Sequence, residues 1–246
     1  MFELLKQGFI KTFIRDNRYK IFVEGFKNTL IITIVAAIIG IILGVIVSFV
    51  HSLAENARDK RQTTAGARCL MALDRFCSAY VAVMRGTPLA IQLMIMTFIV
   101  MSGFPNKVLV CCLAFGINSG AYVSENIRAG ISSVDPGQME AGRALGLSWR
   151  CTMLRVILPQ AVKNIIPAIG NEMIALLKET SIISMVGATV GSLTFDLNAA
   201  SNTVFRKIPN YLASGLIAGV FYLAVVYLMV FLIKLIEKRM KASDKR

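Results

Sequence analysis

Two glutamates are embedded in a strongly apolar part of this chain, where an ionised group is costly. Glu172 and Glu179 are seven residues apart, so on an α-helix they lie on one face. Four further polar residues share this kind of surrounding: Asn118, Glu125, Thr180 and Ser181. Charged groups at membrane depth are rare and mark candidate pathways for polar solutes. We therefore predict that Glu172 or Glu179 faces such a pathway and favours a cationic or polar solute.

Each of these residues also has a purely structural interpretation, which the sequence leaves open. Lys178 or another basic group can pair with one of the two glutamates. The hydroxyls of Thr180 and Ser181 can bond back to the carbonyl four residues earlier in their own helix. Glu125 and Arg128 are three residues apart, which is the spacing of an ion pair on a helix surface. For Arg85, the favoured interpretation is a side chain that extends to the membrane interface rather than one that contacts solute.

Motifs for metal binding, catalysis and nucleotide binding are absent from the sequence. Five cysteines occur with no C-x-x-C pair and no histidine at ligand spacing, and His51 stands alone. We interpret the cysteines as small apolar fillers and His51 as an interfacial residue. No H-E-x-x-H, G-x-S-x-G or G-x-x-x-x-G-K-[ST] pattern is present, so we predict no metal site, no enzyme active site and no P-loop.

Long apolar runs must position these residues. The chain has 246 residues, 56% of them apolar, and runs such as Leu30–Val50 match the thickness of a bilayer at 1.5 Å per residue. No strand-like alternation is visible, so the backbone must satisfy its hydrogen bonds as helices. We predict an all-α polytopic membrane protein with five spans at about 28–50, 79–101, 108–127, 164–183 and 211–236.

Several details of these spans are predicted from small residues and prolines. Gly40 and Gly44 favour close packing of helices. The second span is interrupted at Arg85–Pro88, so either its helix begins upstream or a bent elbow precedes a short span. Pro167 and Gly170 are expected to interrupt the fourth span, and residues 51–78 to form a polar connector. A separate span at 181–197 would raise the number of spans to six.

A basic segment between the third and fourth spans has its own helix signals. Asp135 can cap a helix whose first position is Pro136, and a bend is expected near Gly146. Trp149 with the basic residues Arg150 and Arg155 fits an interfacial second piece.

The stretch from Glu140 to Pro159, EAGRALGLSWRCTMLRVILP, resembles the EAA loop of ABC-importer permeases. RGTP at 85–88 followed by LAIQL, NSGAYVSE at 118–125 and LKETS at 177–181 resemble motifs of the polar amino-acid uptake family, in the family's order. Gly142 and Val156 depart from the usual Ala and Ile, and Gly142 costs about 0.8–1 kcal/mol of helix propensity. We therefore expect a looser but functional coupling helix. The loop positions that match the family are Glu140, Ala141, Gly142, Gly146, Val156, Leu158 and Pro159.

This resemblance implies a type I ABC-importer permease fold in a bacterial plasma membrane, with a coupling loop at about 135–160. It also implies ATP-binding ATPase subunits, an extracellular substrate-binding protein and a second permease chain, identical or similar. ATP and its hydrolysis would belong to the ATPase, and this chain would hold no cofactor. Glu172 departs from the small polar residue usual there. The alternative is a stand-alone ion-coupled secondary transporter that uses Glu172, Glu179 and Glu125, although no inverted repeat is visible.

The distribution of positive charge predicts the orientation. The net charge of +13 lies in segments that flank apolar spans, which favours membrane lipid over nucleic acid as the partner. With the loop at 135–160 in the cytoplasm, 16 Lys and Arg residues lie inside and 9 outside, so the N-terminus is outside and the C-terminus cytoplasmic. We divide the chain into an N-terminal interfacial segment without a cleavable signal (1–27), a transmembrane domain (28–236) and a basic tail (237–246).

Overall fold

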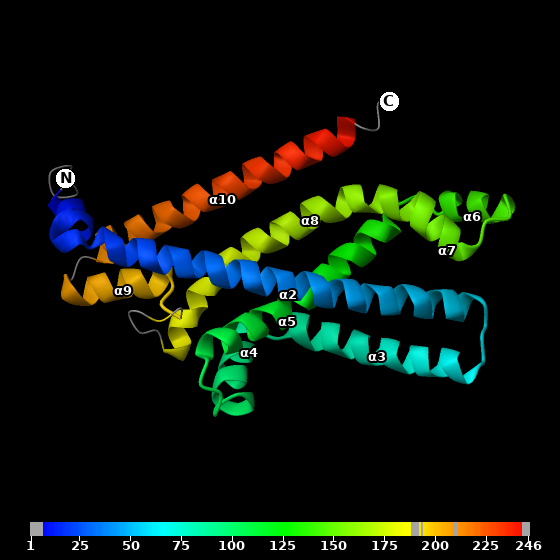
Figure 1. Cartoon of the computed structure of the whole chain (residues 1–246), viewed down its shortest axis with the longest axis horizontal. Coiled ribbons are helices and arrows are strands. Elements are labelled where there is room, and N and C mark those ends of the chain that lie inside the picture. Colours follow the sequence, from blue (N-terminus) through cyan, green and yellow to red (C-terminus); the bar gives the residue numbers. More distant parts are fainter. Residues whose placement is uncertain (1–6, 188–191, 193, 209–210, 243–246) are drawn as a thin grey trace. The chain divides into compact units, whose positions relative to one another are not determined.

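The structure, a computed structural model, describes residues 7–187, 192, 194–208 and 211–242, and within these ranges it is helical without strands (Figure 1). This confirms the all-α prediction. The longer helices are α2 (Tyr19–Asp59), α3 (Ala65–Gly86), α5 (Lys107–Ser132), α8 (Leu158–Glu179), α9 (Leu197–Lys207) and α10 (Tyr211–Ala242). The shorter ones are η1 (Ile10–Ile14), η2 (Arg15–Asn17), α4 (Leu89–Ile95), η3 (Met96–Val100), α6 (Gly137–Ala144), α7 (Trp149–Thr152), η4 (Met153–Ile157) and η5 (Thr180–Val186).

Among the described residues, three helices are long and apolar enough to cross a membrane: α2, α5 and α10. The broken pair formed by α3 and α4 with η3 adds a fourth if it counts as one span. Helix α8, which lies at the fourth predicted span, is not one of these three helices. Its charged and amide side chains lower its mean hydropathy. Over 181–197, where the six-span alternative needs a further span, the described residues form η5 and the start of α9 rather than one continuous helix.

The predicted polar connector at 51–78 is wrong. Helix α2 continues to Asp59, and α3 begins at Ala65 with the hydroxyl of Thr64 accepting a hydrogen bond from the Ala67 N–H at 3.3 Å. Only residues 60–64 connect the two helices. The many charged residues concealed a helical periodicity, because Ala54 and Ala57 face inward while their charged neighbours stay in solvent.

The predicted interruption near Arg85–Pro88 is confirmed. Helix α3 ends at Gly86, and Thr87 and Pro88 both have extended backbone angles before α4 begins at Leu89. A proline disfavours helical geometry at the residue before it, which explains the break at Thr87. Of the two alternatives, the bent elbow before a short helix agrees with the structure, because extended backbone at Thr87 and Pro88 separates α3 from the short helix α4.

By contrast, Pro167 and Gly170 do not interrupt the fourth predicted span. Helix α8 runs through Pro167 from Leu158 to Glu179. Gly170 has a packing role, because a Cβ atom there would lie 2.7 Å from the Cδ1 atom of Ile233 on α10. The residue types suggested backbone breaks, but here the missing side chain at 170 serves close contact between helices.

The chain forms two compact units. The first comprises residues 1–37, 88–116 and 173–229, and the second comprises residues 38–87, 117–172 and 230–246. The core of the first unit gathers Phe22 of α2 with Phe195, Leu197 and Val204. Asn28 donates hydrogen bonds from Nδ2 to the carbonyls of Ser192 (3.1 Å) and Phe195 (3.0 Å) within this unit. Phe22 therefore belongs to a buried core, although the sequence placed it in an interfacial segment.

In the second unit, α2 and α5 pack along a line of small residues. A Cβ atom at Gly40 would lie 2.9 Å from the Cβ and Oγ atoms of Ser119, and one at Gly44 would lie 2.5 Å from Cγ1 of Val123. One turn further, Ser48 donates a hydrogen bond to the Ser124 carbonyl at 3.0 Å. The prediction that Gly40 and Gly44 mediate close helix packing is confirmed.

Candidate functional site

The loop that resembles a coupling helix begins with α6. The Asp135 carboxylate accepts a hydrogen bond from the Gly137 N–H at 2.9 Å, and Pro136 already has helical backbone angles. This geometry agrees with the predicted helix start. Glu140 and Ala141 are both exposed on α6, on the surface of the second unit.

A glycine turn ends α6 and reverses the chain. Gly146 has a φ of +78°, in the left-handed region that favours glycine. The Gly146 N–H donates to the Arg143 carbonyl and the Leu147 N–H donates to the Gly142 carbonyl, both at 3.0 Å. These two bonds are the pattern of a Schellman C-cap. The predicted bend near Gly146 is therefore confirmed, and the backbone hydrogen bonds fix its shape.

Gly142 packs against the second half of the loop. It is buried, and a Cβ atom there would lie 2.5 Å from Cγ2 and 2.6 Å from Oγ1 of Thr152. Thr152 is itself fully buried, and its hydroxyl donates to the Ser148 carbonyl at 3.2 Å. The expectation that Gly142 loosens the loop is not met. The missing side chain brings α6 and α7 together and makes the loop compact.

Apolar side chains project from this compact loop into solvent. Leu145 in the turn is 81% exposed, and Leu154 of η4 is 61% exposed. Leu158 is half-buried and Pro159 is exposed. Exposed apolar side chains on a loop are available for contact with another protein or with lipid. Leu145 and Leu154 were not predicted from the sequence to be exposed contacts, although their position in a basic segment was a usable signal.

Beside the loop lies a groove of about 520 Å³, whose walls come from the end of α2 and from the segment 131–157. Glu55 and Asp59 of α2 line it together with Met139, Arg143 and Trp149. Trp149 is half-buried and lines this groove. From the sequence, Trp149 was expected in an interfacial piece of helix.

Glu172 is half-buried in the second unit and contacts α5. Its Oε1 atom accepts a hydrogen bond from the Ser119 hydroxyl at 3.0 Å. The neighbouring Asn118 is 3% exposed and donates from Nδ2 to the Met84 carbonyl at 3.1 Å. Two of the predicted pathway residues are thus held by contacts between helices of this unit. Ser119, which the sequence analysis quoted only within a motif, is the residue that links α5 to Glu172.

Glu125 lies between two arginines. Arg128 donates from Nε and Nη2 to the two carboxylate oxygens, each at 2.9 Å, as the spacing predicted. Arg85 Nη1 lies 3.1 Å from Oε2 of the same carboxylate, and its guanidinium is 5.4 Å from the centre of the Tyr122 ring. Arg85 therefore contacts α5, where the sequence favoured the membrane interface.

The remaining predicted pathway residues belong to the first unit. The hydroxyl of Thr180 donates to the Leu177 carbonyl at 2.7 Å, so the structural interpretation describes it correctly, with a spacing of three residues rather than four. The Ser181 carbonyl accepts hydrogen bonds from the Asn198 side chain (3.0 Å) and from the Ser184 hydroxyl (3.2 Å). Glu179 is exposed at the end of α8.

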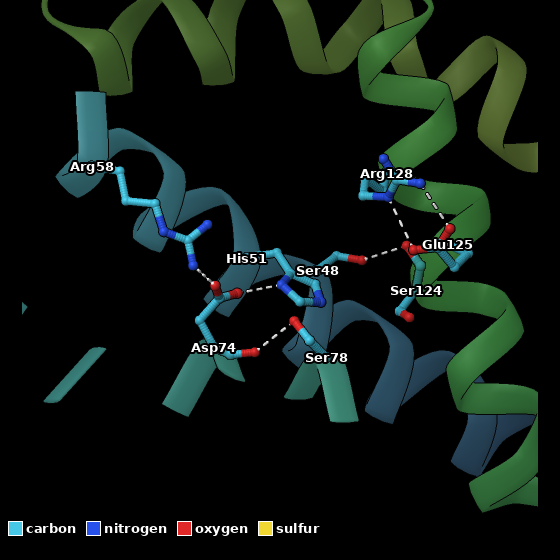
Figure 2. A network of polar contacts seen from close by, with 8 residues as sticks. All are labelled: Ser48, His51, Arg58, Asp74, Ser78, Ser124, Glu125 and Arg128. Atoms are coloured by element: carbon cyan, nitrogen blue, oxygen red, sulfur yellow. Dashed lines mark hydrogen bonds and ion pairs between the residues drawn. The ribbon is translucent and has the colours of Figure 1, made fainter. Parts of the chain in front are cut away.

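A buried carboxylate that the sequence analysis missed joins α2 to α3. Asp74 is 3% exposed, and its two oxygens contact the His51 ring nitrogen Nδ1 and the Arg58 guanidinium (Figure 2). The Ser78 hydroxyl donates to the Asp74 carbonyl at 2.9 Å. The sequence predicted a polar connector at 51–78, so a buried contact between Asp74 and α2 was not expected. Among the residues that the structure describes, no cluster of His, Cys, Asp and Glu side chains could hold a metal ion.

Comparison with known proteins identifies the family. Residues 65–242 match the model of the binding-protein-dependent transport system inner membrane component. The chain is 44% identical over 172 residues to a putative glutamine transport system permease protein of Rickettsia conorii, covering 69% of this chain and 76% of that protein. It is 41% identical over 169 residues to an arginine transport system permease protein of Bacillus subtilis, covering 67% and 74%.

Solved structures agree with this assignment. The crystal structure of an amino acid ABC transporter with histidines matches with a TM-score of 0.75 and 33% identity, over 90% of this chain and 94% of that one. The fold is also shared with the MetNI methionine ABC transporter in an inward-facing form (TM-score 0.69, 22% identity, 92% and 98% covered). The resemblance found in the sequence is confirmed: this chain belongs to the family of inner-membrane permease components of binding-protein-dependent transport systems.

Proposed function

We propose that this chain forms the translocation pathway of an ATP-driven amino-acid importer and couples it to a cytosolic ATPase through residues 135–160. As a member of its family, the chain is a transport subunit of the inner membrane and not an enzyme. The observation that carries the proposal is the compact loop with its exposed apolar turn at Leu145. The relatives are permeases of binding-protein-dependent systems, which leaves the ion-coupled alternative without support.

The loop has the features of a rigid docking element. Its shape is set by the C-cap at Gly146 and by the contact of Gly142 with Thr152. Because the backbone is already fixed, little conformational entropy is lost when a partner binds. In this proposal Leu145 provides the apolar contact, and Glu140 and Ala141 form the exposed face of α6. Leu158 and Pro159 begin α8, the helix that carries the motion of the ATPase into the membrane domain.

The proposed assembly contains two ATPase subunits, two permease chains and an extracellular substrate-binding protein. This chain carries no P-loop motif, so ATP would be bound and hydrolysed on the ATPase subunits. The proposed orientation places residues 135–160 and the C-terminus in the cytoplasm and the N-terminus outside. Modification of single cysteines introduced at Gln7 and at Glu237 by a membrane-impermeant reagent, in a variant without the native cysteines, tests this orientation. Labelling of Glu237→Cys from outside would contradict it.

The proposed cargo is a polar or cationic amino acid. The relatives reported above include permeases named for glutamine and for arginine, which share an ammonium and a carboxylate. A pathway for such a solute needs polar groups in a low-dielectric environment, and Asn118, Glu125 and Glu172 in the second unit, with Glu179, Thr180 and Ser181 in the first, are the candidates. Glu172 carries the strongest expectation, since its carboxylate suits a cationic group. Measured uptake of lysine, arginine and glutamine by Glu172→Gln tests this assignment, and unchanged selectivity would exclude it.

Co-purification with the candidate ATPase tests the coupling function. Glu140→Lys and Gly146→Asp are expected to lose the ATPase while the permease stays folded. Gly146→Asn is the matched control, because asparagine tolerates the left-handed backbone better than other residues with a side chain. It should retain more ATPase than Gly146→Asp. A wild-type chain that never binds an ATPase would reject the proposed coupling and favour a stand-alone transporter.

A further inference from the structure

Ser119 makes an unusual contact for a serine inside a helix. It is 1% exposed on α5, and its hydroxyl donates to Oε1 of Glu172 at 3.0 Å. Among the other helical serines of this unit, Ser48 donates to a backbone carbonyl on another helix, that of Ser124, at 3.0 Å. Ser78 and Ser124 each return their hydroxyl to a carbonyl three or four residues earlier, at 2.8–2.9 Å. That local bond is the usual way for a buried serine to satisfy its donor. The bond from Ser119 instead holds a carboxylate on another helix.

The position of Ser119 is itself restricted by Gly40 of α2. A Cβ atom at Gly40 would lie 2.9 Å from both Cβ and Oγ of Ser119. Such a distance is shorter than ordinary van der Waals contact, so any side chain at position 40 would displace the hydroxyl. Gly40, Ser119 and Glu172 therefore form one line of contact from α2 through α5 to α8. Backbone packing at Gly40 determines where the hydroxyl lies, and the hydroxyl determines where Oε1 of Glu172 lies.

We infer that Ser119 is a positioning residue that holds the Glu172 carboxylate in the orientation in which it meets the cationic group of the transported amino acid. The inference rests on the proposed function, in which Glu172 faces the pathway. A hydroxyl that donates to an ionised carboxylate makes a charge-assisted hydrogen bond, which is stronger than one between neutral groups. A carboxylate held in this way loses less side-chain freedom when it binds a cation.

The test measures uptake by the complete importer in proteoliposomes, with its wild-type ATPase and binding protein. Arginine, lysine and glutamine are the substrates. Ser119→Ala is expected to lower kcat/KM for the cationic substrates about fivefold or more, since fivefold is the scale of a typical hydrogen bond, with a smaller effect on glutamine. Ser124→Ala is the matched control, because the hydroxyl of this equally buried serine of α5 donates to the Ala121 carbonyl of its own helix, and the substitution leaves the backbone carbonyl of Ser124 in place. It should retain wild-type selectivity.

A second pair of variants separates positioning from general packing. Gly40→Ala displaces the Ser119 hydroxyl, whereas Gly44→Ala meets Val123 one turn further along the same helix contact. Both should lower stability, but only Gly40→Ala should change the ratio of arginine to glutamine uptake. If Gly44→Ala changes that ratio equally, the effect is one of packing and the inference is wrong.

A double-mutant cycle supplies the decisive measurement. In the Glu172→Gln background, Ser119→Ala is expected to cost less than about twofold, because the charge that Ser119 positions is gone. An unchanged fivefold loss in that background would overturn the positioning role. A wild-type importer that moves none of the three amino acids would instead reject the proposed function, so the two failures are distinguishable.

Discussion

Gly142 and Thr152 approach so closely that a methyl group at position 142 would lie 2.5 Å from Cγ2 of Thr152. The contact joins α6 to α7, the two halves of the proposed coupling loop. Gly142 departs from the alanine that is usual in the family, and helix propensity alone predicts that glycine destabilises α6. In this chain the missing side chain leaves room for Thr152. The loop of this chain depends on the pair rather than on either residue.

Gly142→Ala, which restores the family's usual residue, is expected to destabilise the loop in this chain. Overpacking of a buried contact costs about 1–3 kcal/mol, more than the gain of about 0.8–1 kcal/mol in helix propensity. The double variant Gly142→Ala with Thr152→Ala removes both clashing atoms, Cγ2 and Oγ1, and should recover ATPase binding. Co-purification of the ATPase and thermal unfolding in detergent measure the two effects. Equal ATPase binding by Gly142→Ala and wild type would contradict this prediction.

Gly146→Ala is expected to weaken the turn because a Cβ atom is unfavourable at a φ of +78°. The cost of left-handed backbone for a residue with a Cβ is about 1–2 kcal/mol. No atom outside the adjacent chain lies within 4 Å of a Cβ at this position, so backbone strain alone is tested. Proteolysis of the loop should become faster in Gly146→Ala. The matched variant Gly66→Ala, at an equally open position with an ordinary φ, should leave the rate unchanged.

Asp74→Ala is expected to loosen the contact between α2 and α3. The carboxylate is buried and contacts both His51 and Arg58, so its removal leaves two cationic or polar groups without their acceptor. Because Arg58 is about half exposed, solvent offsets part of the loss, and we expect a cost of about 1–3 kcal/mol. Thermal unfolding in detergent measures this cost. Ser78→Ala, which removes a bond within α3 alone, should cost less, and an equal loss would contradict the interhelical role.

The buried carboxyl of Asp196 leads us to predict that the stability of the folded protein depends on pH. Burial raises the pKa of its carboxyl from the usual 3.8 to about 6, although the N–H groups of Ala199 and Asn198 at the start of α9 act in the opposite direction. A group with a raised pKa in the folded state binds its proton more tightly when folded. Its stabilising contribution is therefore complete below about pH 3.8 and is lost as the pH rises through about 6.

Asp196→Asn retains a side chain that caps helices well and removes this titration. The melting temperature of the variant, compared with wild type between pH 4.5 and pH 8, is expected to rise relative to wild type as the pH increases. A difference that stays constant over this range would show that the carboxyl of Asp196 does not titrate there. Asp135→Asn is the control, since Asp135 makes a similar bond to a backbone N–H at an exposed helix start.

The fold class, the family and the position of the proposed coupling loop followed from the sequence. Apolar runs of bilayer length can only be helices, because a chain in lipid must satisfy its own backbone hydrogen bonds. The bend at Gly146, the helix break before Pro88 and the pairing of Glu125 with Arg128 were also predictable. Each of them depends on backbone preferences or on spacings of a few residues, which are local properties of the chain.

Contacts between residues far apart in the sequence were decided only by the tertiary structure. Ser119 and Glu172 are 53 residues apart, and His51 and Asp74 are 23 apart, so no local pattern pairs them. The role of a glycine also depends on the tertiary structure, because the residue type alone does not show whether the position needs backbone flexibility or allows close contact between helices. Gly170 and Gly142 proved to be contact positions because Ile233 and Thr152 lie against them. The packing of the whole unit decides which atoms meet across helices. That packing determines the shape of the loop and the contacts of the Glu172 carboxylate.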